Sequence, residues 1–78
     1  MRWNGKRLAR CRQDLGVTQE ALAVLVGATV ADVRRWEGGV GRAEPRASKL
    51  AEVRRALSAK RVELGQGPVD DADLFDGA

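Results

Sequence analysis

Glycines divide the first half of the chain into three short segments, and this spacing constrains the fold more than any other feature. Gly16, Gly27 and the pair Gly38-Gly39 each follow a segment in which apolar residues recur at three- and four-residue intervals. That periodicity predicts amphipathic helices. A glycine just after the last apolar residue is typical of a helix C-terminus. The sequence therefore predicts a series of short helices within one small domain.

Residues suited to capping stand where these helices should begin. Asn4 precedes a helix expected over residues 5–15, Thr18 precedes the second helix, and Thr29 precedes the third. Such side chains accept from backbone N–H groups of the first turn, which lack partners within the helix. Asp32 follows Thr29 at the spacing of a capping box.

The apolar faces of these helices predict the core. The residues expected to face inward are Leu8, Cys11, Arg12, Leu15, Leu22, Ala23, Leu25, Val26, Val33 and Trp36. The Trp36 ring could instead stack on nucleic-acid bases. Because Trp36 lies on the same helix face as Val33, however, we assign it to the core. Cys11 is assigned as a small core residue rather than a reactive thiol.

The second half of the chain predicts a loop, one long helix and a tail. Residues 38–45 are expected to form a flexible loop, and Pro45 suits the start of a helix. Apolar residues then recur along residues 46–64, with Ser58 as the place where this helix could break. We expect a domain over residues 1–64 and an acidic, flexible tail over residues 65–78.

Charge is unevenly distributed between these two parts. All 14 Lys and Arg residues lie within residues 1–61, which carry a net charge of +8, whereas residues 62–78 carry −5. A basic body with an acidic tail indicates a polyanionic partner. The same charge distribution fits a surface that is merely solvated equally well. The choice between this interpretation and a polyanionic partner therefore depends on the sequence motifs.

Several classes of protein are disfavoured by what the sequence lacks. It has no histidine, which excludes histidine-based catalysis and histidine-containing zinc sites, and it shows no Ser/Lys or paired-carboxylate arrangement in a plausible pocket. We therefore expect neither an enzyme nor a cofactor. Cys11 is the only cysteine, so no intramolecular disulfide can form, which fits a reducing cytoplasm. No apolar run approaches the length of a membrane helix, and the first residues do not resemble a signal peptide.

The second and third helices are joined by Gly27-Ala28-Thr29, and two short helices across a glycine turn are typical of a helix-turn-helix. The pattern Thr18-Gln19-Glu20-x-Leu22-Ala23-x-x-Val26-Gly27-x-Thr29-x-x-x-Val33-x-x-Trp36-Glu37-x-Gly39, followed by a proline and an amphipathic helix, resembles the Cro/C1-type (XRE-like) helix-turn-helix family. The resemblance covers roughly residues 8–57. The loop after Gly39 is about two residues longer than the family's usual spacing to the proline.

This resemblance implies an all-α, compact four- to five-helix, lambda-repressor-like domain that binds operator DNA. It further implies that the helix beginning at Val30 is the recognition helix, whose first turn reaches base edges in the major groove. The expected base contacts are Val30, Ala31, Arg34 and Arg35. The arginines can pair with guanine. The alternative interpretation is that both arginines bind only phosphates. Asp32 could accept from cytosine, but a cap on Thr29 is preferred.

Phosphate contacts are expected around this helix. The expected residues are Thr18, Gln19, Thr29, Gly39, Arg42 and Arg10. Val40 offers a further backbone N–H next to Gly39, and Lys6, Arg7 and Arg46 are peripheral candidates, with simple solvation as the alternative for each of these residues. The N-terminus of the second helix offers free N–H groups and the positive end of a dipole, although Thr18 has the alternative of being only a cap. The resemblance also implies a buried structural ion pair between Arg12 and Glu37.

The expected function is that of a transcriptional regulator, by default a repressor that also controls its own operon. The expected form is a homodimer on an inverted repeat, with Leu57, Val62 and Leu64 at the dimer interface. The alternative is a protein-interaction module, such as an antitoxin or adaptor. In that alternative, Leu74 and Phe75 of the acidic tail dock on a partner protein.

Overall fold

The computed structural model describes residues 1–77, and within them the chain is mostly helical. Its α-helices are α1 (Gly5–Asp14), α2 (Gln19–Val26), α3 (Val30–Glu37) and α4 (Ala47–Glu63). Two 3-10 turns, η1 (Gly41–Ala43) and η2 (Asp71–Asp73), and two strands, β1 (Arg2–Trp3) and β2 (Phe75–Asp76), complete the described chain. Within residues 1–77 no helix combines the length and the apolar character needed to cross a membrane.

The caps form as predicted from the sequence. The side chains of Asn4, Thr18 and Thr29 accept from the backbone N–H groups of Lys6, Ala21 and Asp32 respectively. These bonds set where α1, α2 and α3 begin. α4 runs unbroken past Ser58, the point at which a break was possible, and the Ser58 hydroxyl accepts from the N–H of Val69 instead.

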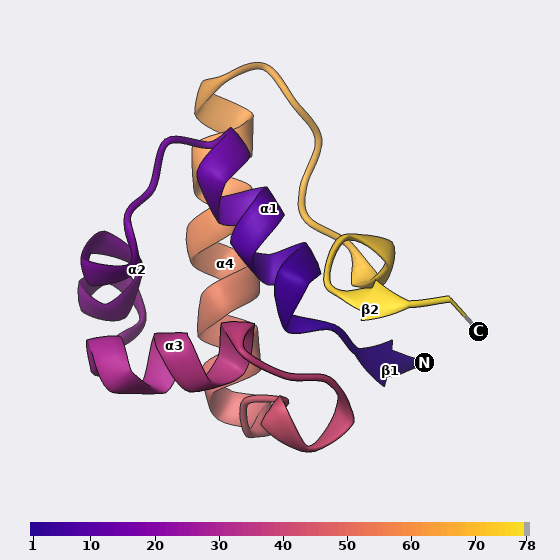
Figure 1. Cartoon of the computed structure of the whole chain (residues 1–78). Helices are drawn as coiled ribbons and strands as arrows, with labels where there is room; N and C mark the ends of the chain where they lie inside the picture. The colour runs from indigo at the N-terminus through magenta and orange to yellow at the C-terminus, as the bar shows by residue number, and fades with distance from the viewer. Residues whose placement is uncertain (78) are drawn as a thin grey trace.

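α4 is the central element, and the other helices surround it (Figure 1). In this view α1 passes in front of α4; α2 packs against both α4 and α3, and α1 packs against α3. Residues of α3 and of the first turn of α4 line one shared hollow, so α3 lies beside the start of α4. The fully buried side chains are Trp3, Leu8, Leu22, Val33, Val53, Leu57 and Leu74. Leu25 was expected in this core, but its side chain is 48% exposed because Leu22, Ala23 and Val26 already fill the inner face of α2.

Residues 69–76, which we call the C-terminal strap, fold back over α1 and α4 (Figure 1). The predicted flexible tail is therefore wrong for these residues, and the structure does not divide between residues 64 and 65. Val69, Leu74 and Phe75 are buried in the same core as the helices. Their burial also removes the basis for the alternative in which Leu74 and Phe75 recruit a partner protein.

The strap also makes the all-α prediction incomplete. β2 pairs with β1 in an antiparallel ladder, with Arg2 opposite Asp76 and Trp3 opposite Phe75. The rings of Trp3 and Phe75 meet edge to face, with centroids 5.6 Å apart, a preferred arrangement of aromatic pairs. The backbone N–H of Asn4 donates to the carbonyl of Leu74. The two ends of the described chain are thus joined.

Candidate nucleic-acid interface

α2 and α3 are joined by a tight turn at Gly27–Thr29. Gly27 has φ 66° and ψ 39°, the left-handed conformation that penalises a side chain. Its N–H donates to the carbonyl of Val24, and the N–H of Ala28 donates to the carbonyl of Ala23, which closes the last turn of α2. The turn therefore needs glycine, as the sequence predicted.

Lys49 of α4 stabilises this turn through hydrogen bonds of its side chain. Its ammonium group donates to the carbonyls of Val26 and Gly27 over 3.1 and 2.8 Å. These carbonyls lie at the negative end of the α2 dipole, so a cation there is favourable. Sequence reasoning missed this role, because Lys49 lies 22 residues from Gly27 and no local pattern signals the contact.

A capping box fixes the start of α3. The Thr29 hydroxyl accepts from the N–H of Asp32, and the Asp32 carboxylate accepts from the N–H of Thr29, both over 3.1 Å. Hydrogen bonds that the Asp32 carboxylate receives from the backbone N–H and from the side chain of Thr29 lower the pKa of Asp32, and Arg35 lowers it further. The preferred interpretation of Asp32 as a cap is confirmed.

The inner face of α3 is buried and its outer face is not. Val33 and Trp36 lie in the core, which confirms the assignment of Trp36. Ala31, Arg34 and Arg35 are exposed, whereas Val30 is partly buried against the core. Three of the four residues expected to contact bases thus lie on one accessible surface, and Val30 lies at its edge.

The two arginines on this surface differ in their surroundings. Arg35 lies 3.1 Å from Asp32, one turn earlier on the same helix, and its side chain remains 65% exposed. Arg34 forms no ion pair with the described residues. An exposed pair at this spacing contributes little to stability, so Arg35 can leave Asp32 at small cost. Both guanidinium groups are accordingly accessible to a partner.

The predicted pair of Arg12 and Glu37 forms and ties α1 to the end of α3. Two guanidinium nitrogens of Arg12 donate to the two carboxylate oxygens of Glu37 over 2.7 and 3.0 Å. Both side chains are at most 10% exposed. The hydrogen bond to Glu37 raises the pKa of Arg12. A third nitrogen of Arg12 donates to the carbonyl of Val17, so the whole guanidinium edge is engaged.

Gln19 belongs to the same network. Its side-chain amide donates to Glu37 over 3.0 Å, so the side chain is directed inward rather than toward a backbone phosphate. The part of the phosphate prediction that concerns this side chain is not supported by its position. The backbone N–H groups at the start of α2 remain available, since Thr18 caps only the N–H of Ala21.

The loop after α3 carries further cations. Arg42, in η1, and Arg46, just before α4, are both exposed. Arg46 and Lys49 line one side of a hollow whose other side is formed by Asp32 and Arg35 of α3. The loop is held to the N-terminal end by the N–H of Gly5, which donates to the carbonyl of Gly39 over 2.8 Å. These cations therefore flank α3.

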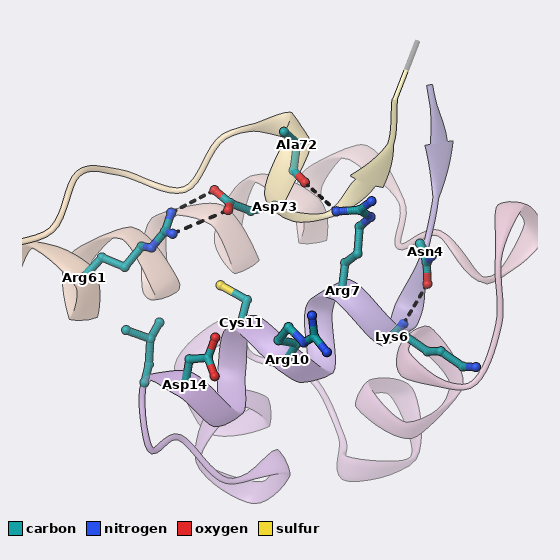
Figure 2. A pocket seen from close by; sticks show the side chains of 10 residues that line it. Asn4, Lys6, Arg7, Arg10, Cys11, Asp14, Arg61, Ala72 and Asp73 are labelled. Carbon is teal, nitrogen blue, oxygen red and sulfur yellow. Dashed lines mark hydrogen bonds and ion pairs between the residues drawn. The ribbon is translucent and has the colours of Figure 1, made fainter.

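Arg10 lies elsewhere. It lines a second hollow, between α1 and the strap, together with Lys6, Cys11 and Asp73 (Figure 2). Arg10 does not lie with the arginines of α3, so the structure gives no support to its predicted phosphate contact. Arg7 is directed to the strap, where it donates to Asp76 and to the carbonyl of Ala72. Cys11 is buried, and its burial raises the pKa of the thiol, in line with a core residue.

The strap neutralises the basic side chains beneath it. Its aspartates pair with arginines of α1 and α4: Arg7 with Asp76, Arg54 with Asp71, and Arg61 with Asp73. The aspartates at the acidic end of the sequence therefore neutralise three positive charges on the α1 and α4 side of the molecule. The exposed cations of α3 and of the loop after it lie outside these pairs.

Comparisons of the chain with protein families, with curated proteins and with solved structures find no match.

Proposed function

We propose that this protein binds double-stranded DNA in a sequence-specific manner through α2 and α3, which act as a helix-turn-helix. In this proposal α3 is the recognition helix and enters the major groove. The observation that carries the proposal is the outer face of α3, where Ala31, Arg34 and Arg35 are accessible on a helix held rigidly at both ends.

The chemistry of this face suits base recognition. A guanidinium group donates two parallel hydrogen bonds to guanine, a contact worth about 1–3 kcal/mol of discrimination. Ala31 offers a methyl group to thymine, and Val30 adds apolar surface at the edge. Because α3 begins with a capping box and ends at the Arg12–Glu37 pair, its side chains are presented without an ordering cost for the backbone.

The surrounding residues suit the phosphate backbone. The start of α2 offers free N–H groups at the positive end of a helix dipole, and Arg42 and Arg46 lie exposed in the loop after α3. Contacts of this kind position a protein on the duplex, whereas base contacts specify the sequence. The strap supports the same orientation, since its aspartates pair with three arginines of the α1 and α4 side, Arg7, Arg54 and Arg61.

The biological role that follows is transcriptional regulation, with repression as the simplest outcome, because a protein seated on promoter DNA excludes the polymerase. In this proposal two subunits bind an inverted repeat, with recognition helices about 34 Å apart in successive major grooves. Regulation of the protein's own operon is part of the proposal.

Selection of bound sequences from random DNA, followed by fluorescence anisotropy on the selected site, tests the proposal. Arg34→Ala or Arg35→Ala should weaken binding about tenfold and relax the preference at one base pair. Arg10→Ala, which removes an exposed arginine from the strap side, is the matched control and should change affinity little. Selection that enriches no sequence, or variants at positions 34 and 35 that bind like the parent, would overturn the proposal.

A further inference from the structure

The second half of α4 has an outward face that the rest of the chain does not cover. Arg55, Ala59 and Glu63 follow one another at four-residue spacing and therefore share this face. The side chains of Arg55 and Glu63 are 71% and 67% exposed, and Ala59 is exposed between them. Val62, next to this row, is 62% exposed.

The order of charges along this face makes it complementary to itself. A cation, a small residue and an anion follow at equal spacing, so a second α4 running in the opposite direction brings each Arg55 opposite Glu63 of the second copy. Ala59 then meets its own equivalent on the two-fold axis, where its small side chain permits close approach of the helices. A parallel arrangement would instead set like charges against each other, which is destabilising.

We propose that this face binds a second copy of the chain, with the two α4 helices antiparallel about a two-fold axis at Ala59. Arg55 already lies 2.7 Å from Glu52 of its own helix, so in the dimer it bridges that carboxylate and Glu63 of the second copy. Val62 becomes covered beside this row. Closed two-fold dimers with such self-complementary surfaces are the commonest oligomers of soluble proteins.

This interface revises the set of residues expected from the sequence. Leu57 is fully buried in the core of its own subunit, so a second copy cannot reach it, and its predicted role in dimerisation is wrong. Val62 stays in the interface. Leu64 follows the last residue of α4 and is exposed, but it points away from the row formed by Arg55, Ala59 and Glu63, since it lies five residues after Ala59 on the helix.

The interface also sets the distance between the two recognition helices, a step that rests on the proposed function. α3 lies beside the first turns of α4, at the opposite end from Ala59 (Figure 1). The ten residues from Lys49 to Ala59 span about 15 Å of helix, and the antiparallel copy doubles this to about 30 Å. That separation is close to the pitch of about 34 Å that relates successive major grooves.

Sedimentation equilibrium of the full chain without DNA tests the interface. The parent protein should dimerise, and Ala59→Glu, which places two carboxylates on the two-fold axis, should leave it monomeric. Ala21→Glu, an exposed position on α2 rather than on α4, is the matched control and should dimerise like the parent. Because both positions are exposed, thermal unfolding should show that both variants remain folded.

A charge exchange separates a contact between helices from an effect within one helix. Arg55→Glu and Glu63→Arg should each raise the dimer dissociation constant about tenfold. The double variant should recover most of this loss, because each glutamate then meets an arginine of the other copy, whereas the contacts with Glu52 and Lys60 stay unfavourable. A monomeric parent protein, a dimeric Ala59→Glu variant, or a double variant as weak as the single ones would overturn the proposal. A dimer that binds no DNA would overturn only the proposed function.

Discussion

The indole nitrogen of Trp3 donates to the main-chain carbonyl of Trp36 over 2.8 Å, and this buried bond joins the N-terminal strand to the last turn of α3. Trp3 in turn contacts Phe75 of the strap. The strap therefore reaches the proposed recognition helix through a single intermediate side chain. Segments at both ends of the sequence thus help to position the face that carries Arg34 and Arg35.

The strap should be essential for stability rather than dispensable. Leu74→Ala removes a fully buried side chain and should lower the free energy of unfolding by about 2–5 kcal/mol, measured by urea denaturation. Ala72→Gly, an exposed position in the same segment, is the control. A Leu74→Ala variant as stable as the parent protein would mean that the strap is not docked in solution.

Loss of Glu37 should be among the most costly changes of a charged residue. Glu37→Ala leaves the buried guanidinium of Arg12 and the amide of Gln19 without their shared acceptor. An unpaired buried charge of this kind costs about 3–5 kcal/mol, so the midpoint of chemical denaturation should fall accordingly. Glu44→Ala, at an exposed position in the loop before α4, should shift that midpoint little. Equal midpoints for the two variants would contradict the network described around Arg12.

Gly5 should tolerate no side chain. A β-carbon at this position would lie 2.6 Å from the carbonyl carbon of Glu37 and closer still to the carbonyl oxygen of Trp36. These are backbone atoms, so α1 and α3 would have to separate. Gly5→Ala should therefore lower the melting temperature markedly, whereas Gly67→Ala, whose β-carbon meets nothing within 4 Å, should not. Circular dichroism melts of the two variants check this difference.

Acid should weaken the docking of the strap. Hydrogen bonds from Asn4 and Arg7 lower the pKa of Asp76. Burial raises the pKa of Asp73, but the Asp70 N–H and Arg61 outweigh it, so that pKa is lowered as well. Because these carboxyls bind protons less readily when folded, their contribution is complete above their usual pKa of 3.8 and is lost as the pH falls below it.

Denaturation midpoints measured from neutral to acid pH should therefore stay level and then fall. An Asp76→Asn variant should show a shallower fall, since one of the two groups no longer titrates. A fall of the same steepness in both proteins would exclude Asp76 as a contributor.

Local patterns were sufficient to predict the helices and their starts, because caps such as Asn4 and Thr29 act within three residues of themselves. The Arg12–Glu37 pair was accessible only through the family resemblance. The strap was not predictable, since five acidic residues among the last seventeen resemble a disordered tail. What folds it is a set of contacts with distant residues, such as that between Asn4 and Asp76. The role of Lys49 escaped prediction for the same reason.

The pairing of β1 with β2 means that any polypeptide continuing outward from Arg2 and any continuing from Asp76 would depart from one edge of the domain. A fluorophore or surface tether attached at either place would lie at this edge of the domain and would leave the outward side of α3 uncovered. A short peptide bridge between the two places would give a circularly permuted protein, with new ends opened in the exposed connection at residues 65–67.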